Sequence, residues 1–172
     1  LNPLYDVQAT AIYDSFPIND RYASLLIIDP RDSISPAHLR RLDDYMAKGH
    51  GVVLAFGAVA TDLSTSPVAS MRDIGIGPWL AKQGVRVGPG IVVDHDCGQV
   101  GVRQAGISDP VYLKFPFYPL ITHFSHHPVA HGLDMAMFQF ASPIFPAGDT
   151  SGTHWSPILY SGPQSGVLTA PL

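Results

Sequence analysis

The chain has 172 residues, of which 46% are hydrophobic and 14% charged, and its net charge is −4. This composition excludes intrinsic disorder, because enough apolar surface is available to offset the chain entropy lost on folding. The 10 lysines and arginines are scattered along the chain, so the sequence offers no basic field for nucleic acid. The low charged fraction predicts that part of the surface faces a partner.

Cys97 is the only cysteine, which excludes an internal disulfide and thiol-rich metal sites. The sequence has no signal peptide and no apolar run close to the roughly 18 residues that span a membrane. It starts without methionine and ends in a Ser/Gly/Pro-rich stretch at 161–166. We therefore expect residues 1–172 to be a single α/β domain, a fragment of a longer membrane-anchored protein.

The first half of the chain has the pattern of a βαβ unit. Alternation predicts an opening strand over Tyr5–Ile12, and the apolar run Ala23–Asp29 predicts a strand buried on both faces of a parallel sheet. Ser35 is a good N-cap for an amphipathic helix that Gly49 or the next glycine closes. The segment Gly51–Phe56 predicts the next buried strand, joined by a right-handed crossover.

The later half is less regular. A helix is predicted over about 70–83, although its glycines make two short helices equally good. Further strands are predicted at 85–93, with a turn at 88–90, and at 136–141 and 157–160. We expect a doubly wound, mainly parallel sheet with helices on both faces, which the later half decorates.

Ligands of an open α/β sheet bind at the carboxyl ends of its strands. These ends carry the candidate binding residues Asp29, Arg31, Asp32, Phe56 and Gly57. The alternative is that the two aspartates only cap the following helix or hold a turn.

The turn after the second buried strand argues against an enzyme. Residues 55–58 read Ala-Phe-Gly-Ala, so the position of a nucleophile elbow holds neither serine nor cysteine. Cys97 follows His95 and Asp96, but adjacent residues of a strand point to opposite faces. No phosphate-binding glycine motif occurs either. The sequence therefore predicts no enzyme and no cofactor.

A histidine-rich stretch is the alternative site for chemistry, with His123, His127 and His131 as candidate metal ligands. Pro128 breaks any helix that would align the last two, and no glutamate is placed to act as a base. We expect surface histidines and no bound metal.

An aromatic segment with the candidate residues Tyr112, Phe115 and Phe117 fits either a hydrophobic docking surface or a loop whose rings cover the sheet edge. Its rings, with Trp79 or Trp155, are also the candidate stacking platforms of a carbohydrate-binding module.

Five stretches in succession carry a resemblance to a known family. The sequence resembles the periplasmic domain of gliding-motility-type ABC transporter auxiliary proteins, an uncharacterised ABC transport system component. Where that family has a Gly-Gly pair, this chain has His50 between two glycines. The stretches are YASLLIIDP (22–30), ISPAHLRRLDDYMAKGHGVVLAF (34–56), GPWLAKQGVRVGPGIVVD (77–94), HPVAHGLDMAMFQFASP (127–143) and WSPILYSGPQS (155–165).

The resemblance implies a flavodoxin-like sheet related to class I glutamine-amidotransferase domains, without their catalytic triad. It implies a parent anchored in the inner membrane by helices outside this fragment, a periplasmic location, and an ABC permease and ATPase as partners. The expected function is a non-catalytic extracytoplasmic accessory domain, with an unknown small ligand as a further partner. The alternatives are a degenerate amidotransferase-like or metal-dependent hydrolase using the His123–His131 cluster, and a carbohydrate-binding module.

Overall fold

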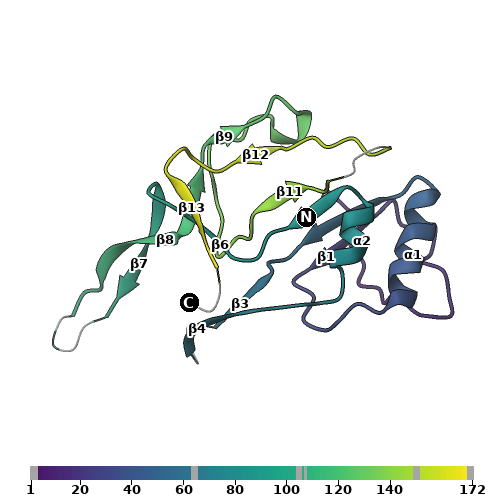
Figure 1. Ribbon diagram of the computed structural model, residues 1–172, viewed down its shortest axis with the longest axis horizontal. Coiled ribbons are helices and arrows are strands. Elements are labelled where there is room, and N and C mark those ends of the chain that lie inside the picture. Colours follow the sequence, from purple (N-terminus) through teal and green to yellow (C-terminus); the bar gives the residue numbers. More distant parts are fainter. Residues whose placement is uncertain (1–3, 63–65, 104–105, 107, 149–151, 170–172) are drawn as a thin grey trace. The chain divides into compact units, whose positions relative to one another are not determined.

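The structure is a computed structural model that describes residues 4–62, 66–103, 106, 108–148 and 152–169 (Figure 1). The chain forms two compact units. Unit 1 comprises residues 1–56 and 74–76, and unit 2 comprises residues 57–73 and 77–172. Whether the chain is one domain of a longer protein stays a prediction.

Unit 1 contains the predicted βαβ motif, formed by β1 (Ser24–Ile28), α1 (Pro36–Ala47) and β2 (Gly51–Ala55). The two strands are parallel, and Leu25 lies opposite Val52. The Ser35 hydroxyl caps α1 by accepting a hydrogen bond from the backbone N–H of His38 at 3.1 Å. Gly49, with a φ of +91°, ends the helix and donates its N–H to the carbonyl of Met46. The start and end of the helix follow the sequence prediction.

The core of unit 1 lies under α1. Leu42 and Tyr45 are buried on the inner face of the helix, and Leu25 of β1 is buried as well. The hydroxyl of Tyr45 donates a hydrogen bond to the carbonyl of Tyr22 at 2.7 Å, and its ring stacks on His50. A buried phenol with a satisfied hydroxyl fixes the helix on the chain that leads into β1.

The predicted opening strand at Tyr5–Ile12 is wrong, since no strand occurs within residues 4–23. The side chains of this segment are exposed almost throughout, including Leu4, Tyr5 and Val7. Alternation alone does not hold a strand without a neighbour to complete its backbone hydrogen bonds.

Unit 2 is built mainly from short antiparallel strands. Its only parts with helical backbone among the described residues are α2 and a 3-10 turn, η1. The elements are β3 (Val59–Asp62), β4 (Ser66–Met71), α2 (Gly77–Lys82), β5 (Val85–Val87), β6 (Ile91–Asp94), β7 (Cys97–Val102), β8 (Val111–Ile121), β9 (His123–Phe124), η1 (Pro128–Ala130), β10 (Ala136–Met137), β11 (Ile144–Pro146), β12 (Leu159–Tyr160) and β13 (Ser165–Leu168).

The expectation of a doubly wound, mainly parallel, flavodoxin-like sheet resembling class I glutamine amidotransferases is wrong. Only β1 and β2 pair in parallel among the described residues; the other paired strands are antiparallel. A parallel sheet needs a crossover of a dozen or more residues between strands, usually a helix. In unit 2 the helix α2 has six residues and precedes β5, which pairs antiparallel with β11.

The later predictions hold only in part. The helix expected at 70–83 shrinks to α2, because β4 extends to Met71 and Gly75 has a φ of +75°. The strand at 85–93 divides at the predicted turn into β5 and β6, while those at 136–141 and 157–160 shorten to β10 and β12. The longest strand, β8, falls on the aromatic segment.

The core of unit 2 centres on Val59, Ala69 and Ile91, against which Phe117 and Phe140 pack. Strands β6 and β13 pair beside it, with Ser165 opposite Asp94. These contacts place the base of β8 in the interior of the unit, while its start extends away from it.

Candidate functional site

The hairpin formed by β7 and β8 extends away from the other strands of unit 2 (Figure 1). Its outer half pairs in a regular antiparallel register, with Gln99 opposite Lys114 and Val102 opposite Val111. Residues directly opposite one another share a face of such a ribbon, and the faces alternate along each strand. The register therefore fixes which side chains lie together.

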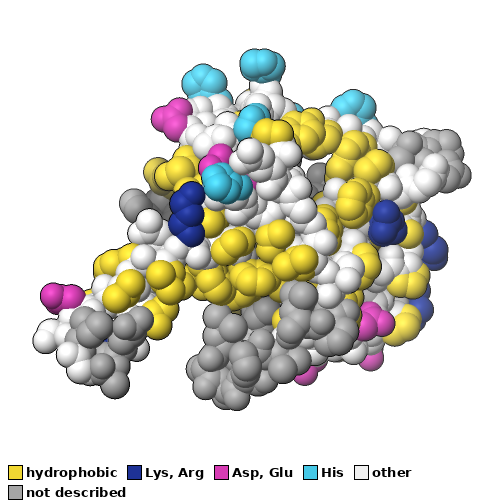
Figure 2. All heavy atoms as spheres, turned by 60° about the vertical axis from the view of Figure 1, so that its left-hand side comes forward, with side chains coloured by type: hydrophobic (Ala, Val, Ile, Leu, Met, Phe, Trp, Pro, Cys, Tyr) yellow, Lys and Arg dark blue, Asp and Glu magenta, His cyan; other side chains and the backbone are white. Residues whose placement is uncertain are grey.

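One face of the outer hairpin is entirely aliphatic. Val100 lies opposite Leu113, and Val102 lies opposite Val111. Leu113 is 49% exposed, Val102 39% and Val111 37%. Figure 2 shows hydrophobic side chains along this arm. We call these four residues the aliphatic face of the hairpin.

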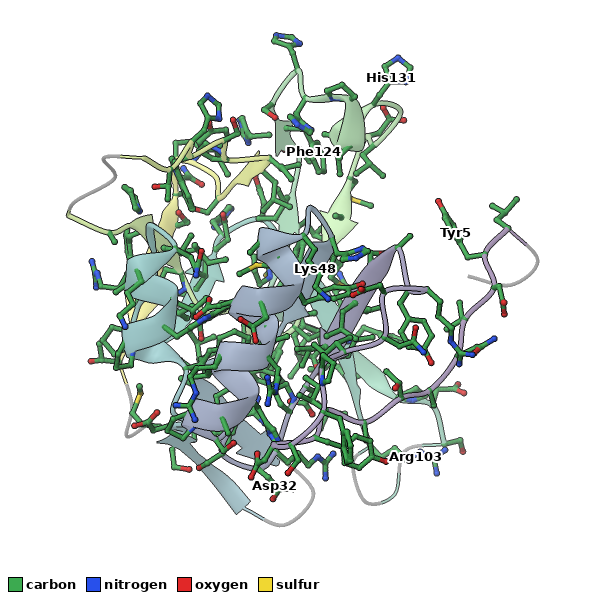
Figure 3. The ribbon with its side chains drawn as sticks, turned by 90° about the vertical axis from the view of Figure 1, so that its right-hand side faces the viewer. Tyr5, Asp32, Lys48, Arg103, Phe124 and His131 are labelled. Carbon is green, nitrogen blue, oxygen red and sulfur yellow. The ribbon has the colours of Figure 1, made fainter. Side chains whose placement is uncertain are left out.

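The opposite face of the hairpin is polar apart from one ring. It carries Gln99, Gly101, Tyr112 and Lys114, and the Tyr112 side chain is 65% exposed. Arg103 follows β7 at the end of the hairpin (Figure 3). The aliphatic and the polar side chains of the outer hairpin are therefore separated onto the two faces of the ribbon.

The base of the hairpin holds an aromatic cluster of Phe115, Phe117, Tyr118 and Phe140. Gly98 of β7 lies opposite the stretch 115–118 of β8, since the register shifts between Cys97 and Gln99. Pro116 has no N–H to donate to a ladder, which accounts for the irregularity there. Ring centroids within the cluster lie 4.9–6.1 Å apart in edge-to-face and tilted arrangements.

The aromatic segment thus divides between the two interpretations that its sequence left open. Tyr112 stands on the exposed outer hairpin, where it is available to a partner. Phe115 and Phe117 are half-buried and belong to the ring cluster at the base, and Phe117 packs on the core. The two phenylalanines therefore position the hairpin, while Tyr112 is free to contact a partner.

The predicted carboxyl edge of the parallel strands lies in unit 1 around Asp29. The N–H of Asp29 donates to the carbonyl of Ala55 at 2.8 Å, which places Asp29 beside the residue that precedes Phe56. Asp29 has a φ of +43°, a conformation that costs a non-glycine residue about 1 kcal/mol or more. Arg31 Nε lies 3.7 Å from Asp29 Oδ2, but both side chains are largely exposed, so this ion pair contributes little.

Asp32 and Gly57 are the two further residues of that predicted edge. Asp32 is exposed (Figure 3). Gly57 belongs to unit 2, where its carbonyl accepts a hydrogen bond from Arg72 Nη2 at 3.2 Å. Gly57 therefore lies in a loop that is held by a hydrogen bond within unit 2.

The side chains of the histidine stretch lie on the surface of unit 2. His123, His126, His127 and His131 are exposed, and His131 points outward (Figure 3). The Nδ1 atom of His127 accepts a hydrogen bond from the N–H of Val129 at 3.2 Å and so caps η1. Within the described ranges, no three His, Cys, Asp or Glu side chains are grouped to hold a metal ion.

Of the two tryptophans proposed for sugar stacking, Trp79 of α2 is buried and Trp155 is half-buried. Cys97 is also buried, in β7, while the neighbouring His95 and Asp96 are exposed. This arrangement offers no exposed thiol for attack on a substrate.

Sequence reasoning missed the buried carboxylate of Asp94. This side chain is 3% exposed, and its oxygens accept hydrogen bonds from the N–H groups of Asp96 and Gly162 at 3.1 and 3.0 Å. A polar residue at the end of an apolar strand was the only available signal, because Gly162 is 68 positions away. The carboxylate ties the β13 side of unit 2 to β6.

A cavity of about 300 Å³ in unit 1 lies on the outer side of α1 and is also absent from the predictions. Asp14 anchors a preceding loop there: its carbonyl accepts from Arg41 Nη2 at 2.8 Å, and its carboxylate lies 3.1 Å from His38 Nε2. The cavity is lined by Asp14, Ala37, Arg40, Arg41, Asp43 and Asp44. The cavity is open, and its lining carries both acidic and basic side chains. Asp14 and Arg41 of this lining already contact residues of the same unit, so the cavity points to no particular ligand.

Two tyrosines of unit 1 have shifted pKa values, and each shift arises from the immediate surroundings of the hydroxyl. A hydrogen bond from Arg21 lowers the pKa of the exposed Tyr22 hydroxyl. Burial raises the pKa of Tyr45, and the charge of Asp20 acts in the same direction. Both phenols are therefore parts of the scaffold.

The chain matches, over residues 1–172, the family described as ABC-type uncharacterized transport system. It belongs to this family, whose members are auxiliary components of ABC-type transport systems. The resemblance seen in the sequence is confirmed at this level. No curated protein matches the chain.

Among solved structures, the chain is similar to the mmIFT52 N-terminal domain, with a TM-score of 0.55 and 15% sequence identity. The match covers 90% of this chain and 65% of that one, so the chain spans just under two thirds of the similar structure. At this identity the likeness shows a shared fold alone. No helix within the described residues has the length and apolar character needed to cross a membrane.

Proposed function

We propose that this chain is a non-catalytic, extracytoplasmic accessory domain of an ABC-type transport system, and that it acts by binding. The observation that carries the proposal is the aliphatic face of the β7–β8 hairpin in a member of this transport family. Hairpins of this kind gain stability only when their apolar face meets another surface.

Docking is favoured by the energetics of this face. Val102, Val111 and Leu113 each keep more than a third of their surface in water. Burying apolar surface stabilises a complex by about 25 cal/mol per Å². Tyr112 and Lys114 stand on the opposite face of the ribbon, so they are not part of this surface. Arg103 follows β7 at the end of the hairpin, where its charge affects the rate of encounter with a partner more than the affinity.

The positions where catalytic residues were sought favour a binding function over an enzymatic one. The turn at 55–58 has no nucleophile, Cys97 is buried, and Nδ1 of His127 already accepts a hydrogen bond from the N–H of Val129. These facts weaken the hydrolase alternatives, including the metal-dependent one at the histidine stretch.

The finer parts of the proposal follow the resemblance to gliding-motility-type auxiliary proteins. The partners would be the permease and ATPase subunits, the location periplasmic, and membrane attachment would come from segments outside this chain. The edge around Asp29 and Arg31 is the second candidate surface, since Asp29 adopts a strained conformation at a strand end.

The test is affinity purification of the full-length parent from detergent-extracted membranes, followed by mass spectrometry. We expect a permease and an ATPase at near-stoichiometric amounts. The double variant Val102→Asp with Leu113→Asp should lose both, whereas Asp29→Ala with Arg31→Ala should retain them. A wild-type parent recovered alone, under detergents that keep other ABC complexes together, would contradict the transport role.

A further inference from the structure

The outer edge of β7 is open. In its sheet the strand order is β10-β8-β7, so β7 pairs on one side only, and no backbone partner occupies its other side among the described residues. Such an edge presents a row of N–H and C=O groups ready to pair with another strand.

This edge also lacks the usual protection against pairing. Proteins blunt exposed edges with charged residues, especially lysine, and with proline. The residues of β7, Cys97–Val102, include neither a charge nor a proline. Its partner β8 carries Lys114, Pro116 and Pro119. The contrast between the two strands of one hairpin marks the β7 edge as a pairing surface.

The occupant of this edge must itself be a strand. Insertion of the hairpin into a lipid bilayer would leave the edge groups of β7 unpaired in hydrocarbon, at several kcal/mol for each group by order of magnitude. A docked helix or loop would cover the aliphatic face but leave the edge bonds unmade. A further strand makes those bonds and widens a two-stranded ribbon, which is marginally stable in water by itself.

We propose that the strand is β7 of a second copy of this chain, paired antiparallel across a two-fold axis. An uncharged strand meets itself without like-charge repulsion, and an isologous pair closes without open ends. With Val100 on the axis, it faces its own copy, while Gln99 faces Gly101 and Val102 faces Gly98. Both pairs off the axis within residues 98–102 then match a larger side chain with a glycine, so this part of the strand is complementary to itself in size as well as charge.

In the resulting dimer the two outer hairpins contribute four paired strands. The aliphatic faces of the two copies, each made of Val100, Val102, Val111 and Leu113, lie on the same side of these strands. This doubles the apolar surface offered by one hairpin. The inference goes beyond the accessory role and does not depend on it, because it concerns the isolated chain.

Cysteine cross-linking tests the pairing directly. Cβ atoms of residues facing each other across an antiparallel pair lie about 4.5–5.5 Å apart, near the separation a disulfide requires. We would introduce Val100→Cys into a Cys97→Ser background and oxidise mildly. The matched control is Leu113→Cys in the same background, because Leu113 faces Val100 within one hairpin but lies one strand away from the edge. We expect a covalent dimer with the first variant and mainly monomer with the second.

Sedimentation velocity of the unmodified chain over a concentration series gives an independent result that needs no cysteine variant. We expect a monomer–dimer equilibrium that Val102→Lys shifts at least tenfold toward monomer. Val167→Lys places the same charge on an exposed valine of β13 and should leave the equilibrium unchanged. A monomer at all concentrations overturns the proposal, as does equal cross-linking of the two cysteine variants, which would indicate face-to-face packing. Dimerisation that Val102→Lys weakens at least tenfold supports the proposed pairing. This holds whether or not transporter subunits are recovered with the parent.

Discussion

The Oδ2 atom of Asp94 accepts a hydrogen bond from the backbone N–H of Gly162 at 3.0 Å, and this contact joins two segments 68 residues apart. A Cβ atom added to Gly162 would lie 3.0 Å from the same oxygen, so the close approach favours a glycine. The carboxylate is thus a clasp inside unit 2, close to the strands that lead into the hairpin.

We expect Asp94→Ala to lower the free energy of unfolding by about 3 kcal/mol, because two backbone N–H groups lose a charged acceptor. Asp94→Asn keeps one acceptor oxygen and should cost less. Urea denaturation measures both, with Asp96→Ala as the control, since the exposed Asp96 contributes only its N–H to the clasp. Equal losses for Asp94→Ala and Asp96→Ala would show that the clasp has no structural role.

Gly90 is a position where the backbone conformation and a close backbone contact both require glycine. Its φ is +136°, and an added Cβ would collide with the carbonyl oxygen of Leu168 on β13. Gly90→Ala should therefore cost about 3 kcal/mol or more. Gly132→Ala is the matched comparison, with a φ of +81° and no atom within 4 Å of the new Cβ, and should cost about 1–2 kcal/mol. Thermal unfolding that ranks the two equally would contradict the close approach of β6 and β13.

We expect ionisation of Tyr45 to make the folded protein less stable at alkaline pH. Burial raises the pKa of its hydroxyl in the folded chain. The unfolded chain therefore loses the tyrosine proton first, at a pH of about 10, and unfolding becomes more favourable as the pH rises further. The contribution is intact below that pH. Tyr45→Phe should flatten this part of the stability curve while costing about 1 kcal/mol for the lost hydrogen bond. Tyr13→Phe, at an exposed tyrosine, should leave the slope intact.

His127 is expected to act as a cap for η1. His127→Ala should lower stability by about 1 kcal/mol because Val129 loses the acceptor for its N–H, and His127→Ser should restore most of it. His131→Ala changes an exposed ring and should stay within about 0.5 kcal/mol. Metal analysis of untagged, dialysed protein should find no stoichiometric zinc, and zinc retained by the wild type but lost in His127→Ala would reverse this assignment.

The sequence was sufficient for the part of the fold that local signals determine. Ser35 and Gly49 mark the two ends of α1, and the apolar runs on either side of the helix form β1 and β2. A strong cap, a helical period and a closing glycine act within a few residues, so they can be recognised without knowing the tertiary structure.

Unit 2 could not be derived in the same way. Its strands are short, and pairs such as β13 with β6 join segments about 70 residues apart. Extending the parallel pattern of unit 1 to these segments produced the wrong fold class. The aromatic segment likewise gave no sign that Pro116 would interrupt the register and leave Tyr112 outside and Phe117 inside.

The most direct test of the docking role is site-specific photo-cross-linking in membranes that contain the full-length parent. A photoreactive residue would replace Leu113 on the aliphatic face or, as the control, Val167, which is similarly exposed on β13. We predict that the Leu113 position cross-links to a permease or ATPase subunit and that the Val167 position does not. Cross-links of equal yield from both positions, or none to a transporter subunit from Leu113, would contradict the hairpin as the docking surface.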